Sequence, residues 1–213
     1  MQTELKTVFD QYVDQLTTAG AISPKVIKTS NEDDVIDELE SLEAISLPEM
    51  VVEYLTLIDG YDDDLCDDLD VYEPEFAWNM YPIEVASIPT VYEDLAGCGG
   101  ADNPDYWPVG FLPILEDGSG SYVVVNCIED SPTYGAVYDM SEGVGCNRVS
   151  DTISDFLEGC RKELVEGLRV FEEPELSTVK DAKSYLVECR KIYGNTPYFS
   201  RIGSMDQQIV DWK

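Results

Sequence analysis

The feature that most constrains this chain is the absence of any basic side chain between Lys28 and Arg148. Residues 31–150 contain 29 Asp and Glu and one basic residue, so this stretch carries −28 of the net charge of −31. Ion pairs within the stretch cannot neutralise these carboxylates, and close neighbours repel one another by about 1 kcal/mol in water. A solvated, solubilising face, a surface for a cationic partner and a salt-loving source organism would each explain the pattern. The length of the stretch and its confinement to one region favour the cationic partner.

The charge and the absence of histidine exclude several classes of function. A chain without His cannot form a Ser-His-Asp or Cys-His nucleophilic site, nor a zinc site with histidine ligands. A surface this negative also repels the phosphates of nucleic acids and of anionic lipids. We therefore expect neither direct nucleic-acid binding nor membrane association.

The distribution of apolar residues predicts an α+β fold. Helical spacing of apolar residues predicts helices over residues 5–16, from Asn31, over 48–60, from Asp151 and from Thr178. Thr178 and Asp181 form the expected capping pair of the last helix. Strands are predicted over residues 111–115, 121–127 and 134–140, and the acidic segment 61–105, rich in Pro and Gly, is expected to be irregular. Helices, then strands, then helices indicate an antiparallel sheet packed against helices.

The sequence lacks signals for export or membrane insertion. The N-terminus has no apolar signal core, and no apolar run approaches the roughly 18 residues of a membrane span. The six cysteines are far apart and contain no CxxC pair. Cys160 and Cys189 fall on apolar helix faces, where a buried, reduced thiol is expected. These features predict a soluble, cytoplasmic protein.

A series of short motifs resembles the SUKH superfamily, which includes a fungal cell-wall synthesis regulator and many bacterial immunity proteins. The matching motifs are Leu47-Pro48, Trp107 before Leu112-Pro113-Ile114, the turn Asp117-Gly118-Ser119-Gly120, the strand Gly135-Ala136-Val137-Tyr138 and the helix pair Phe156-Leu157. Asp59-Gly60 stands where the family more often has Asn-Gly, although Asp also tolerates such a turn. The resemblance spans about residues 32–165. It implies a SUKH-like α+β domain over residues 31–168, with helical extensions over 1–30 and 169–213.

For bacterial members, the resemblance implies an immunity protein, which is a stoichiometric inhibitor of a toxic effector domain, often a nuclease. A nuclease is basic around its active site, so an acidic surface can occupy that cleft and accelerate association. The predicted contact surface comprises Asp59, Asp62, Asp63, Asp64, Asp67, Asp68, Asp70, Glu73 and Glu75.

Other functions remain open. A regulatory scaffold like the fungal relative would bind several cytosolic clients, and an acidic mimic of nucleic acid would inhibit a DNA-binding enzyme. An enzyme would need a carboxylate pair such as Asp67 and Asp70, or Glu116 and Asp117, with one raised pKa and a defined cleft. The abundance of carboxylates indicates neither, so we expect no catalytic residues and no cofactor. The run DDDLCDDLD lacks EF-hand spacing, and we expect no dedicated metal site.

Overall fold

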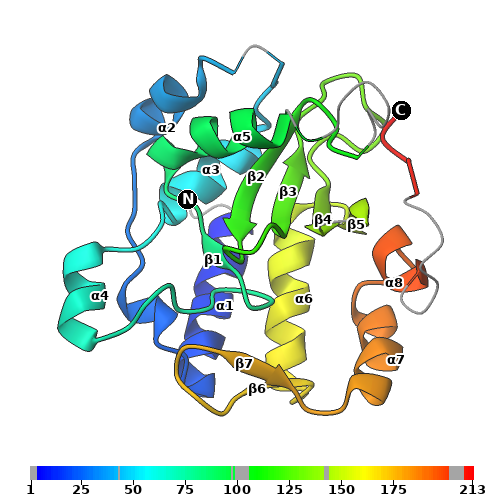
Figure 1. Ribbon diagram of the computed structural model, residues 1–213. Coiled ribbons are helices and arrows are strands. Elements are labelled where there is room, and N and C mark those ends of the chain that lie inside the picture. Colours follow the sequence, from blue (N-terminus) through cyan, green and yellow to red (C-terminus); the bar gives the residue numbers. More distant parts are fainter. Residues whose placement is uncertain (1–3, 43, 97, 99–105, 142–143, 202–208) are drawn as a thin grey trace.

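The computed structural model describes residues 4–42, 44–96, 98, 106–141, 144–201 and 209–213. Its centre is an antiparallel sheet in the order β1-β2-β3-β4-β5 (Figure 1). The strands are β1 (Tyr81–Pro82), β2 (Phe111–Glu116), β3 (Tyr122–Asn126), β4 (Val137–Ser141) and β5 (Gly145–Ser150). The predicted α+β class and antiparallel sheet are therefore confirmed, while β1 and β5 were not predicted.

The β2–β3 hairpin follows directly from its sequence. Phe111 pairs with Asn126 and Leu112 with Val125, and the register shifts after Pro113, which has no N–H to donate to a neighbouring strand. The turn is organised by Asp117, whose Oδ1 accepts hydrogen bonds from the backbone N–H groups of Ser119 at 2.8 Å and Ser121 at 2.9 Å. This turn corresponds to the predicted Asp-Gly motif.

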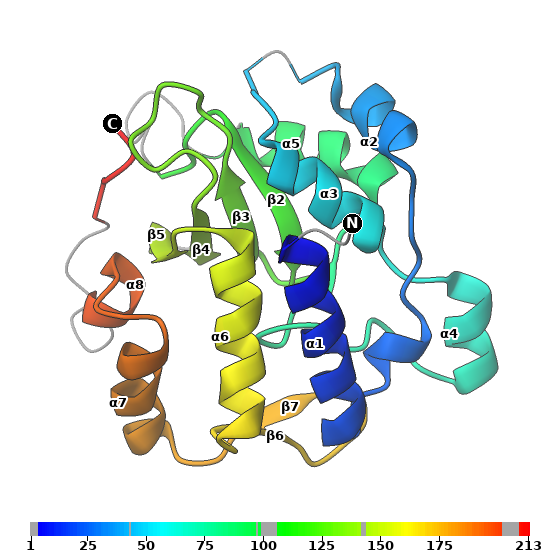
Figure 2. The ribbon, with the colours of Figure 1, turned by 180° about the vertical axis from the view of Figure 1, so that it is seen from behind.

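Helices surround the sheet. They are α1 (Glu4–Ala19), α2 (Glu32–Leu39), α3 (Glu49–Leu57), α4 (Asp63–Leu69), α5 (Ile88–Ala96), α6 (Ile153–Val165), α7 (Ala182–Ile192) and α8 (Pro197–Arg201), with short 3-10 turns at Ser23–Lys25 and Val85–Ser87. Seen from behind, α1 and α6 lie side by side against the sheet, and α7 and α8 lie beyond α6 (Figure 2). Helices predicted near residues 5, 31, 48 and 151 are confirmed.

Two predictions of local structure were wrong. The segment 61–105 contains α4, β1 and α5 rather than irregular chain, although residues 99–105 lie outside the described residues. Thr178 does not begin a helix: it lies in β7 (Ser177–Val179), which pairs with β6 (Arg169–Phe171). The last long helix instead starts after Asp181, whose Oδ2 accepts a hydrogen bond from Ser184 Oγ at 2.6 Å. Thr178 pairs with Val170, eight residues earlier in the chain. The apolar residues after Thr178 have helical spacing, so the sequence predicted a helix there and gave no sign of a hairpin.

One hydrophobic core joins the central sheet with α1, α2, α3, α5, α6 and the two C-terminal helices, whereas α4 contributes no residue to it. Leu5, Phe9, Tyr12 and Leu16 of α1 belong to the same cluster as the central strands, α6 and the C-terminal side chains Cys189, Phe199 and Trp212. Cys160 and Cys189 are buried free thiols, as predicted. The close fit of α7 to α6 depends on Gly159, because a Cβ there would lie 2.0 Å from the ring of Tyr193.

A buried polar network holds the C-terminal hairpin and α7 to the rest of the fold. The Glu163 carboxylate, 1% exposed, accepts hydrogen bonds from Trp78 Nε1 at 2.9 Å and from Tyr185 and Tyr193 hydroxyls at 2.8 and 2.6 Å. Arg169 lies beside it, with Nε 3.4 Å from Glu163 Oε2. These contacts satisfy a carboxylate that would otherwise be costly to bury.

Candidate functional site

The acidic run that dominates the sequence forms a surface helix, α4, in which no residue is buried. Asp62 caps its N-terminus by accepting a hydrogen bond from Leu65 N–H at 3.0 Å, and the first-turn carboxylates of Asp63 and Asp64 interact favourably with the helix dipole. The helix ends at Asp70, which adopts a left-handed conformation with φ +53°. The carboxylates of Asp63, Asp64, Asp67, Asp68 and Asp70 are all exposed.

The exposed surface of α4 is not purely charged. Leu65 and Leu69 are each 41% exposed, and Tyr72, just beyond the helix, is 79% exposed. Apolar side chains surrounded by carboxylates form a mixed surface, typical of protein contacts in which apolar residues lie inside a polar rim. We call α4 together with Tyr72 the α4 surface.

Two of the nine predicted contact residues, Asp59 and Glu75, are buried, whereas Asp62 and Glu73, on either side of α4, are partly exposed. Asp59 is 7% exposed and its Oδ1 accepts a hydrogen bond from Val85 N–H at 2.7 Å. Glu75 is 2% exposed; it accepts hydrogen bonds from Ser177 N–H and, at 2.8 Å, from Ser177 Oγ, and lies 3.7 Å from Arg169. Both carboxylates are held by contacts within the chain, which corrects the predicted exposed surface at both positions; Glu75 is enclosed by the fold, and Asp59 lies in the wall of a cleft.

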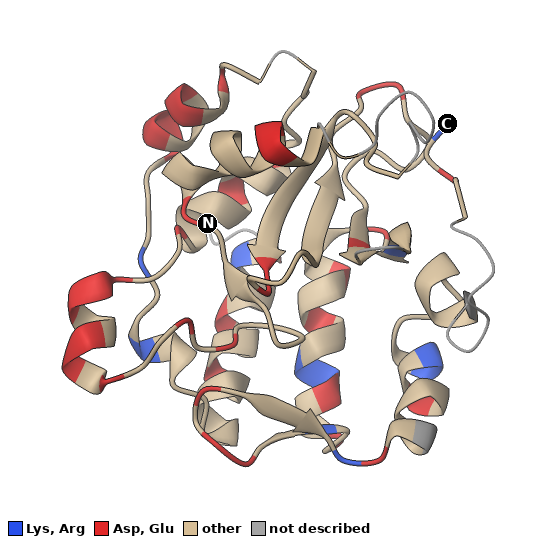
Figure 3. Ribbon diagram, in the orientation of Figure 1, with Lys and Arg blue, Asp and Glu red and all other residues tan. Residues whose placement is uncertain are grey.

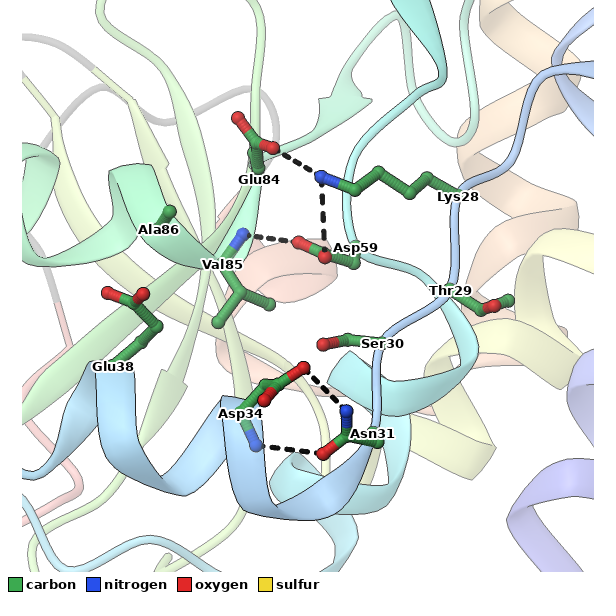
Figure 4. A pocket seen from close by; sticks show the side chains of 10 residues that line it. All are labelled: Lys28, Thr29, Ser30, Asn31, Asp34, Glu38, Asp59, Glu84, Val85 and Ala86. Carbon is green, nitrogen blue, oxygen red and sulfur yellow. Dashed lines mark hydrogen bonds and ion pairs between the residues drawn. The ribbon is translucent and has the colours of Figure 1, made fainter.

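A cleft of about 430 Å³, which the sequence did not predict, opens beside α2 (Figure 4). The carboxylates of Asp34, Glu38 and Glu84 line it, and Lys28 reaches across one end to pair with Glu84 and, at 3.6 Å, with Asp59. The hydrogen bond to Glu84 raises the pKa of Lys28, with burial acting in the opposite direction. Lys28 therefore stays cationic, and the remaining carboxylates leave the cleft negative.

The cleft and the α4 surface are neighbours on one edge of the molecule. The segment before α2 runs beside the segment before α4, joined by hydrogen bonds from Lys28 N–H to Gly60 O, from Asp59 N–H to Lys28 O and from Asp62 N–H to Val26 O. Both α2 and α4 lie along this edge in the two opposite views (Figures 1 and 2). We call the exposed faces of α2 and α4, with the cleft beside α2, the acidic edge.

Acidic residues predominate along both α2 and α4 (Figure 3), and their side chains are exposed. On α2 and directly after it they are Glu32, Asp33, Asp34, Asp37, Glu38 and Glu40, with Ile36 41% exposed among them. Among the described residues, no Lys or Arg forms an ion pair with any exposed carboxylate of α2 or α4. The exposed carboxylates of α2 and α4 are thus left without a counterion among the described Lys and Arg side chains.

Glu116 and Asp117 are the second carboxylate pair considered above for catalysis, and Asp117 has a structural role. Burial, with a smaller contribution from Glu73 and Asp117, raises the pKa of Glu116. Burial also opposes ionisation of Asp117, but hydrogen bonds from Ser121 and Ser119 outweigh it and lower that pKa. Those bonds shape the β2–β3 turn, so the ionised state of Asp117 is explained by the hairpin alone.

In the part of the chain that the structure describes, no three His, Cys, Asp or Glu side chains come together as a metal ion would require. Within the same residues, none of the helices combines the length and the apolar character needed to cross a bilayer.

Comparison with protein families gives one match. A model of the SMI1 / KNR4 family (SUKH-1) matches residues 31–159, which is more than half of the chain and includes both helices of the acidic edge. A comparison with curated proteins finds none that matches. The family match confirms the resemblance inferred from the motifs, with nearly the same limits.

Proposed function

Because the chain belongs to the SMI1 / KNR4 family (SUKH-1), whose members are immunity and regulatory proteins, we propose that it neutralises a cognate bacterial toxin by stoichiometric binding. The toxin is a cationic protein, and we propose a basic nuclease domain. The observation that carries this proposal is the α4 surface, where exposed carboxylates without a counterion surround exposed Leu65, Leu69 and Tyr72. The protein acts without catalysis and without a cofactor.

Electrostatics supports a cationic partner. Exposed carboxylates at consecutive positions of α4 repel one another, and a positive surface placed against them would relieve that repulsion. A negative edge also steers a basic protein during diffusion, which raises association rates by about 10- to 1,000-fold. The active-site cleft of a nuclease, built to hold phosphates, carries the complementary charge.

Charge accounts for rapid encounter, whereas the apolar side chains account for a lasting complex. Leu65, Leu69 and Tyr72 would lose their remaining contact with water in an interface, and Tyr is among the side chains enriched at interface hot spots. The cleft beside α2 offers an additional contact, because Asp34 and Glu38, which Lys28 does not pair with, can accept a Lys or Arg side chain of the partner.

The test measures association of the purified chain with a candidate toxin, a basic nuclease domain. The variant Asp67→Asn/Asp68→Asn removes two charges from α4. Its matched control, Glu172→Gln/Glu173→Gln, removes two exposed charges from the β6–β7 connection instead. We expect several-fold slower association for the α4 variant only, with the difference shrinking as salt rises above about 0.15 M, where the Debye length is about 8 Å.

Other outcomes would redirect the proposal. Equal rates for both variants at every salt concentration would refute a role for α4. Many weak partners in place of one tight toxin would support the regulatory scaffold. Competition between DNA and this chain for one site on an enzyme other than a toxin would support nucleic-acid mimicry.

A further inference from the structure

The last five described residues, 209–213, return to the end of the sheet opposite the acidic edge (Figure 1). They form neither helix nor strand, and they lie outside the family match. Trp212 is nevertheless only 3% exposed, with its ring centroid 5.2 Å from that of Phe111 and 5.6 Å from that of Tyr138, both in edge-to-face orientation. Such geometry is the favourable one for aromatic pairs, so Trp212 occupies a specific aromatic niche.

The residue before the tryptophan is held by charge-assisted hydrogen bonds. Asp211 Oδ1 accepts a hydrogen bond from the Tyr138 hydroxyl at 2.8 Å, and Oδ2 accepts one from Arg148 Nε at 2.8 Å. Arg148 is the only basic residue between positions 29 and 160. In a chain so poor in cations, this guanidinium is committed to a carboxylate of the C-terminal segment, while its Nη1 pairs with Asp151.

The backbone of the segment is also bound. Ser131 Oγ donates a hydrogen bond to the carbonyl oxygen of Trp212 at 2.7 Å. Ser131 is itself positioned by buried Asn126, whose Nδ2 donates to Ser131 Oγ at 2.7 Å and to Thr133 O at 3.1 Å, and whose Oδ1 accepts from Ile128 N–H at 3.0 Å. The receiving loop is therefore organised by contacts that do not involve the C-terminal segment.

The groove extends beyond the dipeptide that fills it. A hollow of about 440 Å³ adjoins Trp212 and is lined by Pro108, Val109, Ile128 and Asp130. Val109 is 58% exposed there. The receiving surface is thus larger than its present occupant and offers apolar contacts to further residues of a bound peptide.

We infer that this end of the sheet is a peptide-binding groove that recognises an acidic residue followed by tryptophan, and that the chain's own C-terminal segment occupies it in competition with a partner peptide of that type. Arg148 and Tyr138 select the carboxylate, the niche beside Phe111 selects the indole, and Ser131 fixes the peptide backbone. Tethering gives the resident segment a high effective concentration, on the order of millimolar, so a partner peptide must exceed it in affinity or local concentration.

The test uses the full chain and a fluorescein-labelled peptide with the sequence IVDWK. The variant Asp211→Ala/Trp212→Ala removes the two side chains that fill the groove and leaves Arg148, Tyr138, Phe111 and Ser131 unchanged. We expect it to bind the peptide at least tenfold more tightly than the unaltered chain does. The peptides IVNWK and IVDAK should each bind at least fivefold more weakly than IVDWK. Adding Arg148→Gln to the emptied variant should weaken IVDWK but leave IVNWK little changed, because only the former needs the guanidinium.

Circular dichroism and thermal melting establish that the emptied variant is folded. If it is not, the single variant Asp211→Asn, which keeps Trp212, replaces it and should bind the peptide more tightly than the unaltered chain. A folded variant that does not bind IVDWK, or that binds IVDAK equally well, would overturn the proposal. A concentration-dependent dimer of the unaltered chain would assign the groove to the segment of a second copy and would likewise overturn competition within one chain. Binding of the toxin at the acidic edge is measured separately, so either proposal can fail alone.

Discussion

The buried carboxylate of Asp139 gives the sharpest prediction about stability. Asp139 lies on β4, is 5% exposed and accepts a hydrogen bond from Ser141 Oγ at 2.7 Å. Burial raises its pKa to about 6, because that one hydrogen bond does not replace the water a carboxylate loses on folding. The ordinary value for an Asp side chain is about 3.9, so the folded state holds this proton more tightly than the unfolded state does.

The sign and size of the effect follow from linkage. Below about pH 4 the carboxyl is protonated in both states and costs nothing, whereas the penalty grows as the pH rises towards 6 and is fully developed above it. A difference of about two pKa units corresponds to about 3 kcal/mol at pH 7. Asp139→Asn keeps the shape and an acceptor for Ser141 while removing the charge. We therefore expect it to stabilise the protein by up to about 3 kcal/mol at pH 7 and by little at pH 4.

Urea unfolding at several pH values between 4 and 7.5 measures this difference directly. Net charge also changes over that range, so the control is Asp94→Asn, the same chemical change at an exposed position. The control should stay within about 0.5 kcal/mol of the unaltered chain. An equal effect of Asp139→Asn at pH 4 and pH 7 would refute the reasoning, because it would mean that the pKa of Asp139 is the same in the folded and unfolded states.

Three further predictions concern packing and capping. Arg169→Met should lower the free energy of unfolding by about 3–5 kcal/mol in thermal or urea melts, because it leaves two buried carboxylates without a cation. The control Arg161→Met, at a half-exposed ion pair, should lower it by at most about 1 kcal/mol. Gly159→Ala should cost about 1–3 kcal/mol in the same melts, because the new methyl group collides with the ring of Tyr193; an unchanged midpoint would mean that α7 can shift freely. Asp62→Ala should accelerate amide hydrogen exchange in α4 by up to about tenfold, because the helix loses roughly 1 kcal/mol of capping free energy. The midpoint of global unfolding should stay almost unchanged.

Each element that the sequence predicted has a buried face, although α5 and β5, which also bury side chains, were not predicted. The helical spacing of apolar residues at Leu5, Phe9, Tyr12 and Leu16 identifies the side of α1 that packs in the core. The alternation of side chains on both sides of the Asp117 turn indicates the β2–β3 hairpin. By contrast, α4 buries no residue, so it has no apolar periodicity to detect. What forms that helix is local: a capping Asp and first-turn carboxylates near the helix dipole.

The buried acidic residues could not have been separated from the exposed ones by sequence. Glu75 and Ser177 are 102 residues apart, and only the folded hairpin brings them together. Asp59 lies four residues before Asp63, the first exposed carboxylate of α4, yet it is fixed by the backbone of Val85. Proximity in the sequence therefore grouped Asp59 and Glu75 with the α4 carboxylates, although long-range contacts give them structural roles.

The two basic residues that bound the acidic stretch explain why its surface charge remains available. Lys28 pairs with Glu84 and Asp59, and Arg148 pairs with Asp211 and Asp151, so both cations are committed to contacts within the chain. Moving Lys28 or Arg148 to neutralise α4 would break a half-buried ion pair. Moving Arg148 away from Asp211 would also release the C-terminal segment. The counterions of the acidic edge must therefore come from solvent or from a partner. A basic protein surface can replace many solvent ions at once, which is why binding there should depend on salt.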